Sequence, residues 1–325
     1  MTSLGGASGP YTGAMNPSEL PPRLAGWYDR RTFGGSPDPA ETTRVKRRRG
    51  ATVSVCLPAR DEEATVGAIC STITREMVEG AGLVDELVVV DSGSTDRTAA
   101  EARAGGARVI EASRAGKGEA LWESLAAATG DVVVWLDSDT KEFGSHFVTN
   151  LVAPLLADES IALCKGFYRR PLATEDGHIG EGGGRVTELA ARPLLALLFP
   201  ELAAVVQPLS GEYAGRAEIL RSLPMFTGYA VEVGILVDVV ERLGLDALAQ
   251  ADLGVRVHRN RDVLSLGRMA AEIMQAILVR AEDQGRLKTV GELGDLLMQF
   301  DQKAAPLPVT SRITLGERPP LGRDV

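Results

Sequence analysis

Between residues 51 and 136, short apolar runs alternate with segments of helical spacing. The runs are rich in Val, Ile and Leu and occupy residues 52–57, 86–90, 107–110 and 131–136. Short apolar runs that alternate with helices are typical of a parallel sheet with a helical layer on each face. The sequence therefore predicts an α/β fold. In such sheets, ligands bind where the carboxyl ends of the strands emerge.

Composition divides the chain into four segments. Residues 1–50 are rich in Gly, Pro, Ser and Thr and end in the basic run 46–49, so we expect an irregular extension. Four charges make a weak nucleic-acid or lipid footprint, and a solvated linker is the preferred interpretation. Residues 51–150 form the half with alternating strands and helices, and residues 151–303 a more helical part. The Pro-rich residues 304–325 are expected to be extended.

Overall charge and cysteine usage limit the class of protein. The 325-residue chain carries a net charge of −9, which argues against a nucleic-acid binder but allows a local basic pocket. Cys56, Cys70 and Cys164 form no C-x-x-C pair, as expected for reduced thiols in the cytoplasm. The first 16 residues show no secretory pattern, and no apolar run approaches the roughly 20 residues of a membrane span.

The loops after the first two apolar runs are polar and contain acidic side chains. The first lacks the Gly-rich turn of a dinucleotide fold, and its carboxylates at residues 61–63 would repel phosphate. They can instead accept hydrogen bonds from a base and a ribose. The second loop, DSGSTD at residues 91–96, could hold base or sugar hydroxyls. A simple helix cap is an equal alternative for this loop.

The strongest local signal is Asp137-Ser138-Asp139, directly after the fourth apolar run. Two carboxylates two residues apart, at the end of a rigid strand, suit Mg²⁺ or Mn²⁺. Such an ion would neutralise diphosphate charge on a leaving group. Asp-x-Asp alone is common by chance, but the preceding DSGSTD loop makes the combination more specific.

Lys117 lies in the sequence GKGEAL at the start of a predicted helix. A helix N-terminus together with an ammonium group can hold a donor phosphate. The Gly-Lys pair superficially resembles a P-loop, but Ala112 and Ser113 occupy the region where the P-loop's earlier Gly is required. We therefore reject an ATPase site.

A second anion site is predicted at residues 182–188, GGGRVTE. The glycines permit close backbone approach, and the following helix start, with Arg185 and Thr187, suits a phosphate that is not the donor's. A flexible loop with an ordinary cap is the alternative. His258 lies among Arg and Asn residues in RVHRNR, at residues 256–261. A lone His is more often structural, but this one could complete the metal sphere beside Asp139.

Taken together, these motifs resemble those of GT-A glycosyltransferases. The resemblance rests on LPA at 57–59, DEEAT at 61–65, DSGSTD at 91–96, GKGEAL at 116–121 and DSD at 137–139. A closer resemblance is to the glucosyl-3-phosphoglycerate and mannosyl-3-phosphoglycerate synthases. It rests on FYRRPL at 167–172, GGGRVTEL at 182–189, QPLSGEY at 207–213 and HRNR at 258–261. The resemblance covers roughly residues 50–280.

The resemblance implies a GT-A-type, Rossmann-like sheet that binds a nucleotide sugar in residues 51–150, with a smaller acceptor-binding part within residues 151–303. It also implies a retaining hexosyltransferase that uses an NDP-hexose, 3-phosphoglycerate and Mg²⁺ or Mn²⁺, and that acts as a homodimer in the synthesis of compatible solutes. The implied donor-binding residues are Pro58, Ala59, Arg60, Asp61, Glu62, Ser92, Lys117, Asp137, Ser138 and Glu232. The implied metal ligands are Asp139 and His258. The implied acceptor-binding residues are Gly184, Arg185, Thr187 and Asn260. Asp139, Lys117 and Glu232 are the implied catalytic residues.

One departure from the family pattern concerns the donor base. The glucosyl enzymes tend to have Leu-Asn where this chain has Arg60-Asp61. A carboxylate can accept a hydrogen bond from the donor edge of guanine, so we expect some tolerance of GDP-mannose or GDP-glucose beside UDP-glucose. Two other classes stay open at this point. They are a sugar nucleotidyltransferase, which would release pyrophosphate, and a non-catalytic nucleotide-sugar-binding module.

Overall fold

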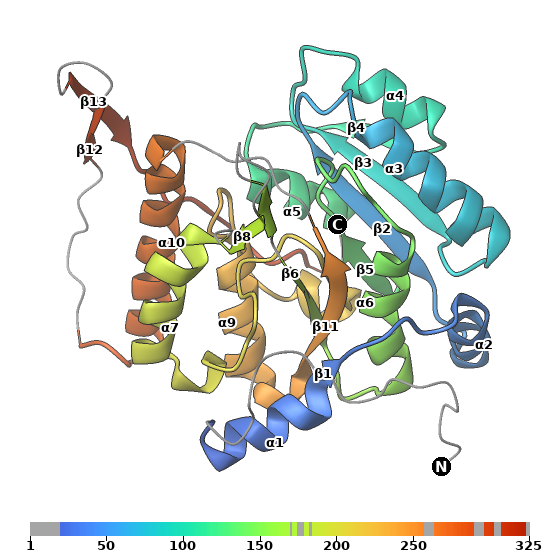
Figure 1. Cartoon of the computed structure of the whole chain (residues 1–325), viewed down its shortest axis with the longest axis horizontal. Helices are drawn as coiled ribbons and strands as arrows, with labels where there is room; N and C mark the ends of the chain where they lie inside the picture. The colour runs from blue at the N-terminus through green and yellow to red at the C-terminus, as the bar shows by residue number, and fades with distance from the viewer. Residues whose placement is uncertain are drawn as a thin grey trace.

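The computed structural model of the chain describes residues 20–169, 171–173, 179–181, 184–256, 263–288, 296–301 and 307–322 (Figure 1). Its centre is one eight-stranded sheet in the order β1-β11-β6-β9-β5-β2-β3-β4. The apolar runs of the first half form parallel neighbours in this sheet: β2 (Val53–Ala59), β3 (Glu86–Asp91), β4 (Arg108–Glu111) and β5 (Val132–Trp135). The predicted α/β class with a largely parallel sheet is confirmed.

Helices cover both faces of the sheet because alternate residues of each central strand are buried on opposite sides. On β2, Val55 and Leu57 belong to one core and Cys56 to the other, and all three are fully buried. The first core includes residues of α3 (Val66–Ile73), α4 (Thr98–Ala104) and α6 (His146–Ala157). The second includes residues of α1 (Pro22–Arg31), α5 (Lys117–Ala127), α7 (Arg192–Leu198), α9 (Val231–Leu243) and α10 (Val263–Asp283).

The second half of the chain contributes strands to the same sheet. β6 (Leu163–Arg169) and β11 (Leu248–Val255) are parallel neighbours. β9 (Tyr213–Arg216) lies antiparallel between β5 and β6. The division expected at residue 150 therefore falls inside one sheet, which both halves share. The antiparallel strand carries no sequence signal of its own, because it is only four residues long.

The expectation of an irregular extension is wrong for residues 20–49. This stretch forms α1, β1 (Thr32–Phe33) and α2 (Pro39–Arg49), and β1 pairs in parallel with β11. Contacts with distant parts of the chain outweigh the Gly- and Pro-rich composition. Trp27 is buried, and its Nε1 donates to the Leu248 carbonyl at 3.0 Å. The basic run at 46–49 ends α2, and Lys46 is buried in an ion pair with Asp85.

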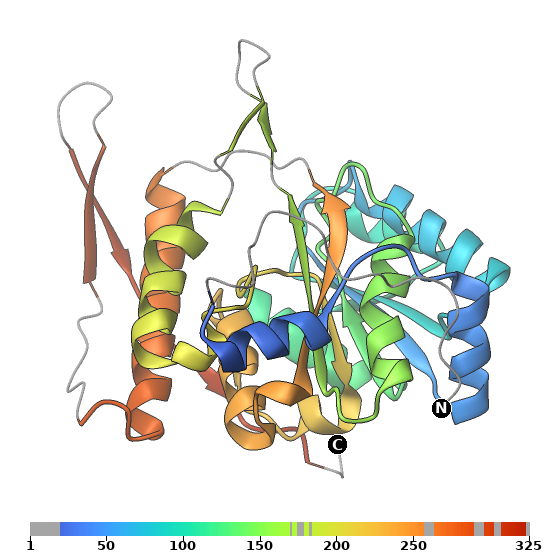
Figure 2. The same ribbon diagram turned by 60° about the horizontal axis from the view of Figure 1, so that its bottom comes forward.

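The C-terminal residues also pair with other parts of the chain. β13 (Leu307–Arg312) pairs with β12 (Leu296–Asp301), and β14 (Glu317–Arg318) pairs with β10 (Met225–Phe226). The expected extended tail is therefore hydrogen-bonded in its described part. Figure 2 shows the β12–β13 hairpin beside α10, with α7 and α10 side by side.

The remaining elements are short. They are β7 (Pro171–Ala173), β8 (Ile179–Glu181), α8 (Ala217–Arg221), π-helical turns at Thr74–Gly80 and Thr187–Ala191, and 3₁₀ turns at Pro200–Leu202 and Leu245–Ala247. Within the described ranges, no helix has both the length and the apolar character needed to cross a membrane.

Candidate active site

The predicted donor loops meet at the carboxyl ends of β2, β3 and β5. β2 lies between β3 and β5, so the loops after these strands are neighbours at the point where the strand order reverses. Ser138 Oγ donates to the Pro58 carbonyl at 2.7 Å, and the Ser92 amide donates to the Ala59 carbonyl at 2.9 Å. The structure therefore joins four of the predicted donor-binding residues in one hydrogen-bonded rim, with Asp137 adjacent in sequence.

Asp61 fastens the first loop to the second. It adopts a φ of 53°, a conformation that Asp and Asn tolerate better than most side chains. Its amide donates to Ser94 Oγ at 3.0 Å, and its Oδ1 accepts from the Thr95 amide at 2.7 Å. The neighbouring Glu62 amide donates to Thr98 Oγ1 at 2.7 Å. Arg60 is exposed. One oxygen of the Asp61 carboxylate is therefore engaged within the protein.

Lys117 links two of the predicted acidic residues. Its Nζ lies 3.0 Å from Asp137 Oδ1 and 2.7 Å from Glu232 Oε1. Glu232, in the first turn of α9, is only 4% exposed, whereas Lys117 and Asp137 are 23% and 24% exposed. Burial disfavours the Lys117 ammonium, but the charges of Asp137 and Glu232 outweigh it and raise the pKa of Lys117 well above its ordinary value. Lys117 is therefore a permanent cation at the strand ends.

Arg256, just after β11, is a second cation at the same place. Its Nη1 lies 3.2 Å from Asp137 Oδ2, and its Nη2 lies 2.5 Å from Asp139 Oδ1. Nη1 also contacts the carboxylate of Glu212, which is buried just before β9. Burial opposes the charge of Arg256, but Glu212 and the other anionic neighbours raise its pKa.

The two cations set the charge state of Asp137. Burial alone would raise the pKa of this carboxyl, but Lys117 and Arg256 lower it far below its ordinary value. Burial has the larger effect on Glu212, whose pKa is raised despite the nearby Arg256. The cluster of Lys117, Arg256, Asp137, Glu212 and Glu232 is a set of mutually dependent charges, because each buried ion requires its partners.

Only part of the predicted metal site lies within the described residues. Asp139 is 40% exposed and presents carboxylate oxygens, which suit Mg²⁺ or Mn²⁺. His258 lies outside the described residues, as does the predicted acceptor ligand Asn260. Within the described part of the chain, His, Cys, Asp and Glu side chains form no group of three that could hold a metal ion.

Three of the four predicted acceptor residues lie at a helix start. Gly184 has a φ of 86°, which favours glycine, and its carbonyl accepts from the Glu188 amide at 2.9 Å. Arg185 follows it, and Thr187 is buried at the start of the π-helical turn. Lys117, at the other predicted anion site, forms its ion pairs with Asp137 and Glu232 and not with the described residues of this segment. The two predicted anion sites are therefore built from different segments.

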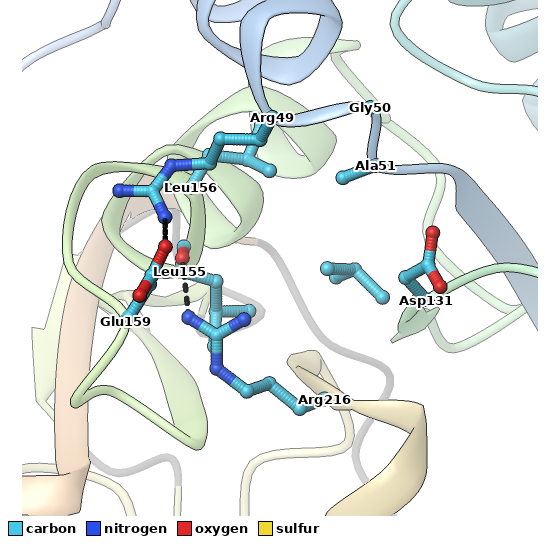
Figure 3. Close-up of a pocket in the computed structure, with 9 residues that line it drawn as sticks. Arg49, Gly50, Ala51, Asp131, Leu155, Leu156, Glu159 and Arg216 are labelled. Atoms are coloured by element: carbon cyan, nitrogen blue, oxygen red, sulfur yellow. Dashed lines mark hydrogen bonds and ion pairs between the residues drawn. The ribbon is translucent and has the colours of Figure 1, made fainter.

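A separate pocket lies at the opposite end of the sheet, near the start of β5 (Figure 3). It has a volume of about 270 Å³ and is lined by residues that include Arg49, Asp131, Glu159 and Arg216. Arg216 donates to the carbonyls of the α6 C-terminus and of the turn that follows it. None of the predicted site residues lines this pocket, so we place the active site at the carboxyl ends of the strands.

Comparison with known proteins identifies the family of the chain. The family model described as glycosyl transferase family 2 matches residues 54–201. A glucosyl-3-phosphoglycerate synthase of Mycolicibacterium smegmatis is 48% identical over 281 residues, covering 84% of this chain and 89% of that protein. This chain belongs to the glucosyl-3-phosphoglycerate synthase family. It is a hexosyltransferase with a GT-A fold, as the resemblance of its motifs implies.

Two further relatives come from Mycobacterium tuberculosis. The glucosyl-3-phosphoglycerate synthase of strain H37Rv is 54% identical over 242 residues, which is 71% of this chain and 74% of that protein. A crystal structure of the enzyme from this species holds Mn²⁺, uridine diphosphate and phosphoglyceric acid. It matches with a TM-score of 0.77 and 46% identity, covering 87% of this chain and 94% of that chain.

Sequence reasoning gave no role to Glu212, Arg256 or Lys165. Glu212 and Arg256 fall within motifs singled out in the sequence, but their partners come from distant strands. Lys165 had a local signal, because a lysine inside the apolar run LCKGF is rarely buried without a partner.

Proposed function

We propose that this enzyme transfers glucose from UDP-glucose to 3-phosphoglycerate with retention of anomeric configuration, giving glucosyl-3-phosphoglycerate, a precursor of the compatible solute glucosylglycerate. The observation that carries the proposal is the Lys117–Asp137–Glu232 cluster at the strand ends. It lies in a chain whose relative from M. tuberculosis binds uridine diphosphate, phosphoglyceric acid and Mn²⁺. Lys117 lies between the carboxylates of Asp137 and Glu232. This arrangement suits a sugar diphosphate, because the cation can bind its anionic oxygens and the carboxylates can accept from its hydroxyl groups.

In this proposal, Lys117 supplies positive charge to the departing diphosphate. Its raised pKa keeps it charged at neutral pH. The buried Glu232 accepts hydrogen bonds from hydroxyls of the donor hexose, and Asp137 accepts one from the ribose. Pro58, Ala59, Arg60, Glu62 and Ser92 contribute to the nucleotide site. The 3-phosphoglycerate hydroxyl attacks from the face that the diphosphate leaves, and its proton passes to a leaving-group oxygen.

We propose that Asp139 and His258 hold Mg²⁺ or Mn²⁺. The carboxylate oxygens of Asp139 support this assignment, because hard divalent cations prefer oxygen ligands. When bound, such an ion neutralises charge that develops on the diphosphate. Asp139 must exchange its contact with Arg256 for the metal, and its 40% exposure leaves it accessible for that exchange.

The acceptor phosphate is proposed to bind at Gly184, Arg185 and Thr187, together with Asn260. Support comes from the left-handed backbone of Gly184 at the start of a helical segment. Amides at such a start point toward an incoming anion, and a guanidinium can bind phosphate through two parallel hydrogen bonds.

UDP-glucose is proposed as the preferred donor, with weaker tolerance of GDP-glucose or GDP-mannose. The expected tolerance depends on an Asp61 carboxylate that faces the base. The bond from the Thr95 amide to Asp61 Oδ1 supports a fastening role for Asp61 instead. An asparagine could accept the same bond, so the difference from Leu-Asn in other glucosyl enzymes need not change the base preference.

The test is a panel of UDP-glucose, GDP-glucose and GDP-mannose, each with 3-phosphoglycerate and Mg²⁺. The proposal predicts fastest release of UDP from UDP-glucose, dependent on 3-phosphoglycerate. Asp139→Ala should lose turnover by several kcal/mol of transition-state stabilisation. Release of pyrophosphate would identify a nucleotidyltransferase instead. Binding of UDP-glucose without turnover, unaffected by Asp139→Ala, would identify a non-catalytic binding module.

We further propose that the enzyme acts as a homodimer in the cytoplasm. Leu189 on the π-helical turn and Leu197 on α7 are 79% and 77% exposed, and both elements pack beside α10. Large apolar side chains exposed together on one surface are typical of a protein–protein interface. Cys56, Cys70 and Cys164 are free and buried, which suits a reducing compartment. Light scattering should give twice the chain mass for the wild type and a monomer mass for Leu189→Glu/Leu197→Glu.

A further inference from the structure

Lys165 is a fully buried lysine on β6, and the charges of the cluster act on it. Its side chain is only 1% exposed, and its Nζ donates to the Ser210 carbonyl at 2.6 Å. Nζ also lies 4.3 Å from the centre of the Tyr213 ring, a favourable position for a cation. Within the described ranges, Lys165 forms no salt bridge with a carboxylate. A lysine buried in this way is costly, so its place in the core calls for a reason.

The segment that Lys165 holds is the one that packs against Asp137. Ser210 is followed by Gly211, where a Cβ would overlap the Asp137 carboxylate. Glu212 comes next; its Oε2 accepts from Ser210 Oγ at 3.1 Å, and its other oxygen contacts Arg256. The hydrogen bond from Lys165 to Ser210 is therefore connected to Asp137 in two ways. One is the packing of Gly211 on Asp137, and the other runs from Glu212 through Arg256 to Asp137.

Lys165 also balances the charges of the buried cluster. The charged groups that face it are Glu232 of α9, Lys117 of α5, Glu212 before β9 and Asp137 after β5. With Arg256, the cluster holds three cations, Lys117, Lys165 and Arg256, against four carboxylates, Asp137, Asp139, Glu212 and Glu232. Loss of the Lys165 charge therefore increases the excess of negative charge, which repels an incoming diphosphate.

We propose that Lys165, in its protonated form, is a positioning residue for the donor site. It fixes the Ser210–Tyr213 segment against Asp137 and balances the charge of the cluster, so that the site accepts an anionic nucleotide sugar. This role rests on the proposed donor site but concerns a residue on β6, outside the strand-end loops. It is distinct from catalysis, because Lys165 is fully buried and its Nζ is bound to the Ser210 carbonyl.

The proposal predicts a characteristic pH dependence. Burial, opposed by the charge of Glu232, lowers the pKa of Lys165 from 10.5 to about 8. As the pH rises through this value, Lys165 loses its proton and the KM for UDP-glucose should rise, by about tenfold between pH 7 and pH 9. The free energy of unfolding should increase as the pH rises from about 8 to 10.5. The unfolded chain binds more protons between pH 8 and 10.5, so this group favours folding as the pH rises through that interval.

The test compares Lys165→Met, Lys165→Arg and the control Lys46→Met. Lys46 is also a buried lysine that donates to backbone carbonyls, but it belongs to α2 and contacts residues 82–85 instead of the charge cluster. Circular dichroism and equilibrium binding of UDP-glucose in Mg²⁺ accompany the kinetics at pH 7, 8 and 9. Lys165→Met should bind donor about tenfold more weakly at pH 7, with no further change to pH 9. Lys165→Arg, whose charge does not titrate here, should keep tight binding across the range.

Lys46→Met should lose stability but keep the wild-type rise in KM. A wild-type KM that stays flat from pH 7 to pH 9 would overturn the proposal, and so would a Lys165→Met variant that keeps the rise. If Lys165→Arg does not fold, the comparison of wild type with Lys165→Met and Lys46→Met still decides the matter. Absence of any transfer to 3-phosphoglycerate by the wild type would refute the proposed function instead.

Discussion

Replacement of Lys117 by Met should separate the stability of the charge cluster from its role in catalysis. Met conserves the length of the side chain but removes the ammonium that lies 2.7 Å from Glu232 and 3.0 Å from Asp137. Asp137 keeps Arg256 as a partner. Glu232 has no other ion pair in the described part of the chain and is 4% exposed, so its carboxylate is left buried and uncompensated.

The magnitude follows from the cost of breaking one side of a buried ion pair, which is about 3–5 kcal/mol. We therefore predict a loss of about 3–5 kcal/mol in the free energy of unfolding at pH 7.

The assay is urea unfolding of Lys117→Met, Glu232→Gln and the double variant, with UDP release measured on each. The double variant should recover most of the stability, because no unpaired charge remains buried. Its activity should stay about 100- to 1,000-fold below wild type, because the cation for the diphosphate is still missing. Lys288→Met, at an exposed lysine, is the control and should change stability by less than about 0.5 kcal/mol. A double variant no more stable than Lys117→Met would refute this reasoning.

Three further predictions concern other parts of the structure. Arg256→Met should lower the free energy of unfolding by about 3–5 kcal/mol in urea, because it strands the buried Glu212; a loss under about 1 kcal/mol would contradict the pairing. Asp61→Asn should leave the KM for UDP-glucose within about twofold of wild type in steady-state assays, because an amide oxygen still accepts from the Thr95 amide; a large rise would return Asp61 to the donor site. Trp27→Ala should cost about 3–5 kcal/mol in thermal or urea unfolding, since this buried indole joins α1 to the sheet. A negligible cost would show that α1 folds independently.

Much of the nucleotide-binding half is predictable from the sequence, because its signals are local. The apolar runs that form β2, β3, β4 and β5 lie within one or two residues of their expected bounds. The turns that follow them carry the donor residues, and parallel strands bring such turns to one edge of the sheet. The proximity of Asp137 to the Pro58 loop therefore follows from the order of the strands.

The rest of the site depends on contacts between distant segments. Glu212, Arg256 and Lys165 are brought together by β9, an antiparallel strand too short to be recognised, and by the neighbouring β6 and β11. No periodicity in the sequence specifies that β9 inserts between β5 and β6. The same limit explains the error at the N-terminus, where buried Trp27 and the pairing of β1 with β11 organise a stretch of Gly- and Pro-rich composition.

The most direct test of the proposed function is NMR of the products formed from UDP-glucose, 3-phosphoglycerate and Mg²⁺. ³¹P spectra identify the nucleotide released, and the coupling of the anomeric proton identifies the linkage. We predict UDP together with an α-linked glucosyl-3-phosphoglycerate, and no product when a chelator removes the metal. A β-linked product would contradict retention. Release of pyrophosphate, or an unchanged 3-phosphoglycerate signal while the nucleotide sugar is consumed, would contradict glucosyl transfer to this acceptor.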